Sequence, residues 1–543
     1  MYNAPPLPPF ISPKESQLTV PSQPINRGQW LALIAALLGW MFDGAEMGIF
    51  SLVGRPALKD LLQNMPSTDT DINVRIALWM GVIVAGFLVG AATGGVLFGW
   101  LGDRIGRVRA MTLSVLCYAL FTSLGGFAQT PLQLGLLRFV AALGMGGEWS
   151  LGVALVMEAF PNRSRAFMAG LIGAAANVGY LLVAAAGLMV NSWIGPLETT
   201  MREMNLPDWL IATPQNQGWR VIMILGIVPA ALTFFIRLFV PESKKWEDEK
   251  SKGNTGYWAT GDLIGVFIGV LGPAVMVYAY ASSSTFGIQH SIALRAVVTI
   301  LGLAIAILGY LYPVKRYIFR QNASGANQAE TSTTIRRMLL AAALSGVALL
   351  GTWGATQNTP AWANQLTEAQ KQVDGIERNA KEYVLLWLSL GAITGTIAAA
   401  FAGDYFGRRK TYFCLCAMSL VSVWCLFHGN TSYGPWLLFW SYAAGACSAS
   451  FYGWLPLYLP ELFATRVRAT GQGFGFNFGR IIAAVGSLQL GNLVNYFAGG
   501  LTLGPWELAG GFPTACSLLS LIYVVGMCLI WFAPETKGRP LPD

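Results

Sequence analysis

Long apolar runs alternate with short polar segments along almost the whole chain of 543 residues. Each run covers about 18 to 28 residues, and a helix needs about 20 apolar residues to cross the hydrocarbon core of a bilayer. The pattern predicts an all-α polytopic membrane protein with fourteen spanning helices. The predicted spans lie near residues 29–54, 77–101, 109–128, 131–157, 166–191, 219–240, 261–282, 293–314, 337–357, 383–402, 411–428, 436–458, 469–496 and 512–533.

Basic residues fall in alternate loops between these spans. The basic loops contain Arg104, Arg107 and Arg109; Arg163 and Arg165; Lys244 and Lys245; Lys315, Arg316 and Arg320; Arg336 and Arg337; Arg408, Arg409 and Lys410; Arg466 and Arg468; and Lys537 and Arg539. Loops rich in Lys and Arg stay in the cytoplasm. An even number of spans leaves both termini on one side, so we expect both to be cytoplasmic in a multi-pass protein of the cell membrane.

The composition excludes several classes of protein. Charged residues make up 11% of the chain and apolar residues 54%, whereas soluble domains contain about 25% charged residues. A soluble enzyme, a coiled coil and a disordered chain are excluded, and the net charge of +8 is attributed to cytoplasmic loops rather than to nucleic-acid binding. The seven cysteines lie in or beside apolar runs without metal-ligand spacing, so we expect neither disulfides nor a metal or other cofactor.

The chain contains an internal repeat. The Gly-Asp-x-x-Gly-Arg sequence at 102–107 recurs at 403–408, and Glu-x-Phe-x-x-Arg-x-Arg-Ala at 158–166 recurs at 461–469, with offsets of 301 and 303 residues. Pro-Glu-x-Lys closes each half, at 241–244 and 534–537. Parallel repeats of this kind build transporters from two halves related by an axis along the membrane normal.

The repeat sets the predicted domain boundaries. We expect a disordered cytoplasmic tail at 1–28, a six-helix bundle at 29–240, a central insertion with two extra helices at 241–336, a second six-helix bundle at 337–535 and a short tail at 536–543. The two inserted helices carry few polar groups, so we expect them to face lipid or another copy of the chain.

At these motifs the sequence resembles the major facilitator superfamily. The loop after the second span reads Gly99-x-x-x-Asp103-Arg104-x-Gly106-Arg107-x-Arg109, and the second copy keeps Asp404, Gly407, Arg408 and Arg409 but has Ala400 in place of the first glycine. The inserted pair, Asp43-Gly44-x-Glu46 in the first span and Gly479-Arg480 in the eleventh are similar to the sialate and organic-acid:proton symporters. The seventh span lacks the paired glutamines of sugar porters, which disfavours a hexose substrate.

This resemblance implies a 6+2+6 arrangement and secondary active transport by alternating access. It also implies proton coupling by an acid of the first span and an arginine of the fourth, here Asp43 and Arg138. Charges within the bilayer cost about 2.5–3.5 kcal/mol each on insertion scales, so the few present are functional candidates. A static buried pair that fixes helix packing is the alternative for Asp43 and Arg138.

Two further acids lie within the predicted spans. Glu46 is one turn from Asp43 and either forms a carboxylate pair with it or lies in water at the outer rim. Glu148 lies in the fourth span beside glycines and is either a second proton site or a packing partner. We assign both, with Asp43 and Arg138, to proton coupling.

Arg480 is the candidate for binding the substrate. It lies about 16 Å into the eleventh span, and its guanidinium suits a carboxylate. The alternative is an ion pair with Asp43 or Glu148. Neutral polar and aromatic candidates for the same site are Asn177, Tyr180, Trp353, Gln357, Asn358 and Asn477, although hydrogen bonds between helices would also explain the amides.

Charged residues at the cytoplasmic ends are predicted to form ion pairs that close the inside. The predicted cytoplasmic gate consists of Asp103, Arg104, Arg107, Glu158, Arg165, Glu242, Asp404, Arg408, Glu461, Arg468 and Glu535. Breaking such pairs while the halves rock would give alternating access.

The sequence therefore predicts a proton-coupled importer of a small organic anion, such as sialic acid, another sugar acid or a carboxylate. A proton-coupled transporter of sugars or aromatic acids, and an exporter of the same fold, remain alternatives. Its expected partners are the anion, protons and the lipid bilayer, and we expect a monomer. No nucleotide-binding loop, metal cluster or nucleophile with a base is found in the sequence, so enzymatic activity is not expected.

Overall fold

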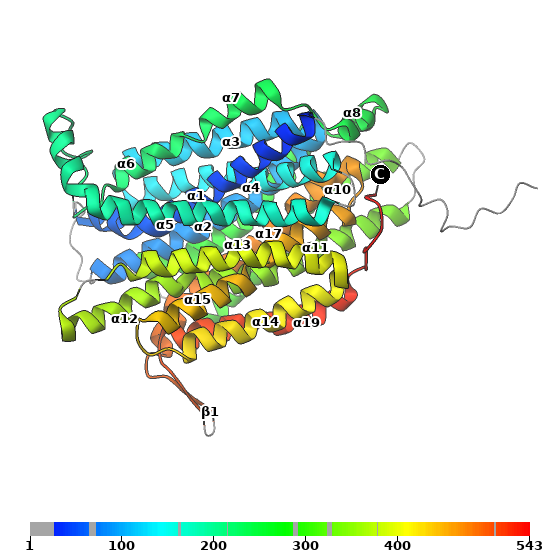
Figure 1. The fold of residues 1–543 in the computed structure, drawn as a ribbon. Helices are drawn as coiled ribbons and strands as arrows, with labels where there is room; N and C mark the ends of the chain where they lie inside the picture. The colour runs from blue at the N-terminus through cyan, green and yellow to red at the C-terminus, as the bar shows by residue number, and fades with distance from the viewer. Residues whose placement is uncertain are drawn as a thin grey trace, which may run out of the picture.

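The computed structural model is a bundle of long helices that run roughly side by side (Figure 1). It describes residues 27–63, 72–160, 164–213, 215–285, 291–322, 328–376, 378–503 and 506–542. Within these residues, eleven helices are long and apolar enough to cross a membrane. The predicted tail at 1–28 lies outside the described residues except for its last two positions.

The first half of the bundle, called here the N-terminal half, ends before residue 241. Its elements are α1 (Arg27–Gln63), α2 (Ile72–Ile105), α3 (Arg107–Leu124), η2 (Gly125–Phe127), α4 (Pro131–Ala159), α5 (Arg165–Glu203), α6 (Trp219–Ile224), η4 (Leu225–Ile227) and α7 (Ala230–Phe239). Thr130 caps the start of α4, since its side chain accepts a hydrogen bond from the Gln133 amide, and Pro131 occupies the first turn of the helix.

The second half, called here the C-terminal half, begins at α11. Its elements are α11 (Gln328–Gly354), η7 (Thr356–Asn358), α12 (Thr359–Asp374), α13 (Ala380–Phe406), α14 (Arg408–His428), α15 (Pro435–Ser448), α16 (Phe451–Tyr458), η8 (Leu459–Leu462), η9 (Thr465–Val467), α17 (Arg468–Tyr496), β1 (Leu501–Leu503), β2 (Trp506–Leu508), α18 (Phe512–Ser520), α19 (Ile522–Leu529) and η10 (Ile530–Phe532).

The segment between the halves forms a short helix and a long helical pair. Its elements are α8 (Lys244–Ser251), η5 (Asn254–Tyr257), η6 (Thr260–Asp262), α9 (Leu263–Thr285) and α10 (Ile292–Asn322). The pair packs against α2 of the N-terminal half and α17 of the C-terminal half. Tyr310 of α10 is hydrogen-bonded to Thr93 of α2 at 2.7 Å and contacts the ring of Phe478 edge-on.

Two predicted spans are less regular than the sequence pattern suggests, and a third is continuous but less apolar. The runs 219–240 and 436–458 are each divided, into α6 and α7 around η4 and into α15 and α16, and they and α17 are not among the eleven helices above. The count of fourteen therefore stays a prediction. The all-α expectation also misses an antiparallel hairpin, in which Leu501 pairs with Leu508 and Leu503 with Trp506.

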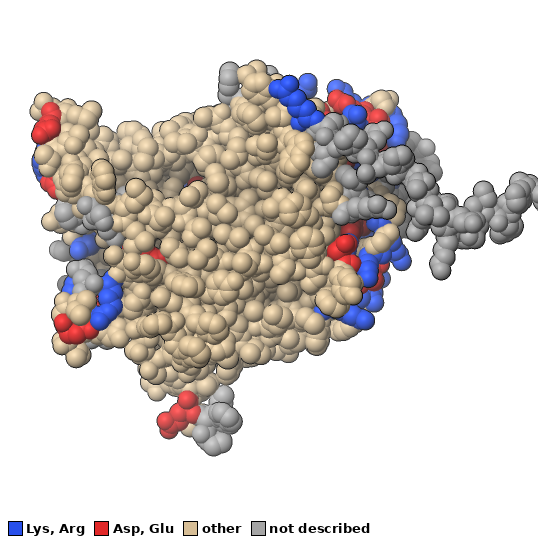
Figure 2. All heavy atoms as spheres, in the orientation of Figure 1, with Lys and Arg blue, Asp and Glu red and all other residues tan. Residues whose placement is uncertain are grey.

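The surface is divided into an apolar band and two charged ends (Figure 2). The C-terminus and α8 lie at one of these ends (Figure 1), which also carries the residues of the predicted gate and is called here the gate end. A band of this kind is expected where lipid tails cover the side of a helical bundle.

The two halves meet along two helix pairs, α2 with α17 and α5 with α13. Glycines allow both approaches. A Cβ at Gly473 would lie 2.2 Å from the Gly95 carbonyl oxygen, and one at Gly170 would lie 3.0 Å from the Ile397 Cα. Backbones in such contact can form a tight seam between the halves.

Candidate functional site

A central cavity lies between the halves, with a volume of about 80 Å³. Of the predicted site residues, Asp43, Asn177, Tyr180, Trp353, Gln357 and Arg480 line it. Aromatic side chains that the sequence analysis did not single out form much of the wall, namely Trp40, Trp149, Tyr452 and Phe476. Trp149 and Phe476 are stacked across the two halves with their ring centroids 3.7 Å apart.

Arg480 brings a positive charge to this cavity from α17. Its side chain is 5% exposed, and its Nε and Nη1 atoms have no hydrogen-bond partner. The guanidinium lies over the Phe476 ring, 5.4 Å from the centroid, and Asp43 is its principal opposite charge. Arg480 therefore has donors to spare for a ligand.

Asp43 and Glu148 face each other from α1 and α4. When the Asp43 and Glu148 carboxyl groups are both ionised, neither Glu148 oxygen has a hydrogen-bond donor. Asp43 Oδ1 also has no donor. A proton on one carboxyl would supply the hydrogen bond between the two side chains. Gly39 makes room for this arrangement, because a Cβ there would lie 1.6 Å from Glu148 Oε1.

Arg138 forms its ion pair with Glu46, not with Asp43. The Thr122 hydroxyl also donates to Glu46 Oε1, at 2.9 Å, and the Arg138 guanidinium lies between the rings of Phe50 and Phe87. The expected pairing of Asp43 with Arg138 is therefore wrong in this structure. Both partners are buried, so the alternative of an outer-rim Glu46 in water is wrong as well.

The amide candidates are largely occupied by backbone bonds. Asn177 donates to the Gly173 carbonyl and Asn358 to the Trp353 carbonyl. Asn477 donates to the Gly146 and Gly473 carbonyls, and it packs on Gly95 at the seam between the halves. Neither Asn477 nor Asn358 lines the cavity, so for these two residues the structure favours the alternative interpretation of helix packing.

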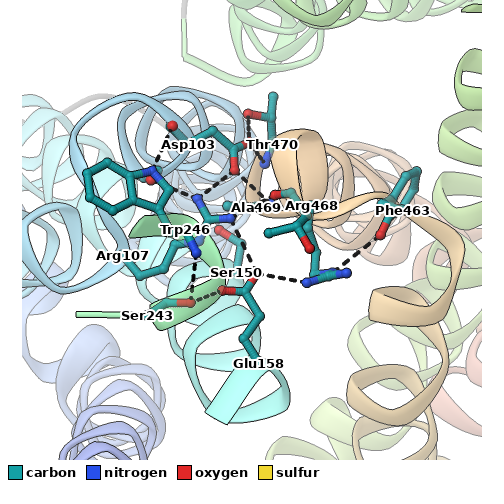
Figure 3. Close-up of polar contacts among 12 residues, drawn as sticks. Asp103, Arg107, Ser150, Glu158, Ser243, Trp246, Phe463, Arg468, Ala469 and Thr470 are labelled. Carbon is teal, nitrogen blue, oxygen red and sulfur yellow. Dashed lines mark hydrogen bonds and ion pairs between the residues drawn. The ribbon is translucent and has the colours of Figure 1, made fainter. Parts of the chain in front are cut away.

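At the gate end, Asp103 of α2 binds the start of α17 across the two halves (Figure 3). Its carboxylate accepts hydrogen bonds from the Thr470 amide at 2.9 Å and the Thr470 hydroxyl at 2.6 Å. Arg107 pairs with Asp103 at 2.7 Å and donates to the Thr465 carbonyl of the other half at 2.9 Å. The sequence repeat pointed to Asp103 and Arg107, but no motif marked Thr470.

Glu158 of α4 forms the second connection between the halves (Figure 3). It pairs with Arg468 at 2.9 Å and, more loosely, with Arg107 at 3.3 Å. Two residues near the start of α8 cover this cluster, since the Ser243 hydroxyl donates to Glu158 and the Trp246 indole donates to the Asp103 carbonyl. We call Asp103, Arg107, Glu158, Arg468 and Thr470 the gate cluster.

The motif residues Arg408 and Asp404 of the C-terminal half pair within that half. Arg408 pairs with Glu461 at 2.7 Å within its own half. Asp404 is 53% exposed along its side chain and lies 3.6 Å from Arg408. Arg104 donates to Thr260 of the central segment. Arg165 has Glu461 of the other half as its principal opposite charge.

Glu242 and Glu535 bind helix termini instead of guanidinium groups. Glu242 accepts from the amides of Arg107 and Val108 at the start of α3, and Glu535 from those of Arg408 and Arg409 at the start of α14. Arg107 and Arg408 are nearby opposite charges for Glu242 and Glu535 respectively, and a gate role for these two acids stays a prediction. Each helix begins after a glycine with positive φ, Gly106 at 115° and Gly407 at 96°, and a carboxylate there also suits the helix dipole.

The two capping acids differ electrostatically. Burial raises the pKa of Glu242, and the amides of Ser243, Val108 and Arg107 only partly offset this rise. Burial also acts to raise the pKa of the more exposed Glu535, but the amides of Arg408, Arg409, Lys537 and Thr536 prevail and lower it.

Comparison with known proteins supports a transporter fold. The family described as "Sugar (and other) transporter" matches residues 31–255. A "Probable 4-methylmuconolactone transporter" of Cupriavidus pinatubonensis is 25% identical over 93% of this chain and 90% of its own length. The "Cis,cis-muconate transport protein" of Acinetobacter baylyi is 23% identical over 91% of this chain and 94% of its own.

Solved structures are similar over nearly the whole chain. The proton:xylose symporter XylE superposes with a TM-score of 0.61 at 16% identity. The aligned region covers 95% of this chain and 98% of the XylE chain. The human organic anion transporter MFSD10 has a TM-score of 0.57 at 15% identity, with 93% and 100% covered. At such identities the likeness shows the fold alone.

Proposed function

We propose that this protein carries a small organic anion together with protons. Its fold is that of the major facilitator transporters, and its sequence resembles transporters rather than enzymes. The substrate is a carboxylate that binds Arg480 in the central cavity. The proton sites are the carboxyl pair Asp43 and Glu148 and the ion pair of Glu46 with Arg138.

The observation that carries this proposal is the state of the Arg480 guanidinium. It is buried in the cavity wall with two nitrogens that donate no hydrogen bond. Leaving buried charged donors unpaired costs free energy, and a carboxylate that takes two parallel hydrogen bonds removes that cost. An anionic ligand therefore gains most of its affinity at this residue.

The cavity wall favours a flat, unsaturated or aromatic carboxylate over a polyhydroxylated sugar acid. Four of its side chains are Trp40, Trp149, Tyr452 and Phe476, whose rings offer broad apolar faces and only a few donors, among them the unpartnered Trp40 indole N–H. Asn177 and Thr352 already bond to backbone carbonyls. The names of two relatives, a muconate and a methylmuconolactone transporter, agree with this class, whereas sialic acid would need many more polar partners.

Charge balance explains how the proton and the anion are coupled. When Asp43 and Glu148 share one proton, their single negative charge balances Arg480, and Glu46 balances Arg138. A bound carboxylate adds one negative charge, which is costly in a buried site unless the second acid is also protonated. Each monocarboxylate should therefore enter with one proton.

The gate end is proposed to face the cytoplasm. It carries the loops richest in Lys and Arg, which by the positive-inside rule remain inside. The gate cluster joins the two halves at this end. Under an inward proton gradient the expected direction is import, and an exporter of the same fold is the alternative.

Uptake into proteoliposomes under an imposed pH gradient tests the proposal. The panel contains cis,cis-muconate, benzoate, sialic acid and xylose as labelled substrates. We expect uptake of at least one flat carboxylate, driven by the gradient and reduced at least tenfold by Arg480→Gln. The matched control is Arg202→Gln, because Arg202 is 54% exposed at the end of α5, and it should transport like the wild type.

Two results would contradict the proposal. Uptake of xylose alone would remove the role of Arg480 in recognising an anion. Uptake of a carboxylate that ignores the pH gradient would remove the proton coupling, and uptake that rises when the gradient is reversed would favour an exporter.

A further inference from the structure

A buried tyrosine lies among the acids of the N-terminal half and has no assigned role. Tyr118 of α3 is fully buried, and its hydroxyl has no hydrogen-bond partner. The charged groups that act on it are Glu148, Asp43 and Glu46, in that order. It is not part of the cavity wall, so it is separated from the proposed substrate.

Tyr118 and Thr122 share one face of α3, because they are four residues apart. Thr122 already donates to Glu46 Oε1 at 2.9 Å. The other Glu46 oxygen, Oε2, is buried and has no donor. The face of α3 that carries Tyr118 is therefore directed at the same acid that is paired with Arg138.

The other end of this polar region is the carboxyl pair. Glu148 lies against the backbone of α1 at Gly39, and both of its oxygens lack a donor. Glu46 lies one turn after Asp43 on α1. The unpartnered Tyr118 hydroxyl therefore lies in the electrostatic field of three carboxyl groups, and Glu46 and Glu148 each have a buried oxygen without a donor.

We propose that Tyr118 is a proton-transfer bridge between Glu46 and the Asp43–Glu148 pair, running behind the substrate cavity inside the N-terminal half. This proposal rests on the proton coupling argued above. In the transfer, the Glu46 carboxyl gives its proton to the Tyr118 oxygen while the phenolic proton passes to a Glu148 oxygen. The phenol ends neutral, Glu46 is left ionised beside Arg138, and Glu148 is protonated.

A purely structural tyrosine explains these observations less well. A buried hydroxyl without a partner costs free energy, and phenylalanine would fill the same volume without that cost. Tyr523 of α19 is a second buried tyrosine whose hydroxyl makes no hydrogen bond of ordinary geometry, with the Ser419 hydroxyl as its nearby polar neighbour. The first group to act on Tyr523 is Cys416, and no carboxyl group is among those that do, so it serves as a matched control.

The test compares Tyr118→Phe and Tyr523→Phe in the full-length protein in proteoliposomes. Two rates are measured with the flat carboxylate that the wild type takes up best. One is exchange of labelled for unlabelled substrate at equal pH, which needs no net proton movement. The other is accumulation driven by a pH gradient, with substrate-induced proton uptake followed by an external pH electrode.

We expect Tyr118→Phe to keep exchange within twofold of the wild type while accumulation and proton uptake fall at least tenfold, and Tyr523→Phe to change neither. Accumulation by Tyr118→Phe equal to the wild type would overturn the bridge. Equal loss of exchange and accumulation by Tyr118→Phe would also overturn it, because a structural role predicts that result. Failure of the wild type itself to couple protons would instead refute the proposed function.

Discussion

The acid pair of Asp43 and Glu148 depends on the absence of a side chain at one position. A Cβ on residue 39 would lie 1.6 Å from Glu148 Oε1 and 2.8 Å from its Cδ. Contacts this short cannot persist, so an alanine would push the Glu148 carboxyl away from α1. Overpacking of this kind costs about 1–3 kcal/mol, but its main effect should be on the shared proton.

We therefore predict that Gly39→Ala folds with a modestly lower melting temperature but loses gradient-driven accumulation at least tenfold. The matched control is Gly81→Ala on α2, where a Cβ meets nothing within 4 Å, and it should be neutral or slightly stabilising. Thermal unfolding and uptake measured side by side check this. Wild-type accumulation by Gly39→Ala would show that the position of Glu148 does not matter for coupling.

At this scale the sequence identifies the residues but not their partners. Charges are so scarce in the spans that Asp43, Glu46, Arg138, Glu148 and Arg480 stand out without a structure. Asp43 and Glu46 differ in height by only about 4.5 Å along α1, less than the uncertainty in where a predicted span begins. Which acid meets Arg138 therefore depends on helix rotation and packing, and only the structure resolves it.

At the scale of elements, the repeated Pro-Glu-x-Lys sequences act as helix caps whose electrostatics differ. The folded pKa of Glu535 is lower than its ordinary value of 4.5, so Glu535 stabilises the fold above about pH 4.5 and this contribution is lost as the pH falls through the lower folded pKa. The folded pKa of Glu242 is raised above 4.5. The stability that Glu242 contributes to the fold is therefore fully present below about pH 4.5 and is lost as the pH rises through the folded pKa.

The expected outcome is that Glu535→Gln destabilises the protein more than Glu242→Gln at pH 7. The difference should shrink as the pH falls below about 4.5 toward the lowered folded pKa of Glu535. Thermal unfolding of both variants in detergent between pH 4 and pH 7.5 measures this. A larger loss for Glu242→Gln at pH 7 would reverse the assignment.

Helix positions follow well from hydropathy, whereas breaks and caps do not. The apolar runs locate α2, α3, α4, α13 and α14 because each of them is a single long helix. Runs such as 219–240 look equally apolar in sequence, yet η4 and Pro229 divide this one into two helices. The capping role of Glu242 requires a contact between residues more than 130 positions apart, which no local pattern reveals.

For the whole molecule, the two halves are similar in sequence but not equivalent at the gate end. Asp103 binds Thr470 of the other half, whereas its repeat counterpart Asp404 is largely exposed and pairs loosely with Arg408 of its own half. The repeat predicts a symmetric gate, because both copies carry the same motif. The asymmetry arises in three dimensions, where α2 lies against α17 and the end of α13 faces outward.

This asymmetry predicts that only one of two matched substitutions opens the gate end. Asp103→Asn removes the negative charge that accepts hydrogen bonds from Arg107 and from the Thr470 amide and hydroxyl. Hydrogen bonds to an ionised carboxylate are stronger than those between neutral groups. Loss of such buried partners costs several kcal/mol, enough to shift an equilibrium between two states of the transporter. Asp404→Asn removes an exposed charge whose pairing is worth about 0–1 kcal/mol.

Distances between spin labels at positions 109 and 410, both exposed at the gate end of opposite halves, measure the shift. The exposed Cys414 and Cys528 and the partly exposed Cys117, Cys425 and Cys447 are first replaced by serine to confine labelling to the introduced cysteines. We expect Asp103→Asn to add a longer-distance population and Asp404→Asn to leave the distribution unchanged. Equal shifts would restore a symmetric gate, and no shift with Asp103→Asn would mean that the gate cluster does not hold the halves together.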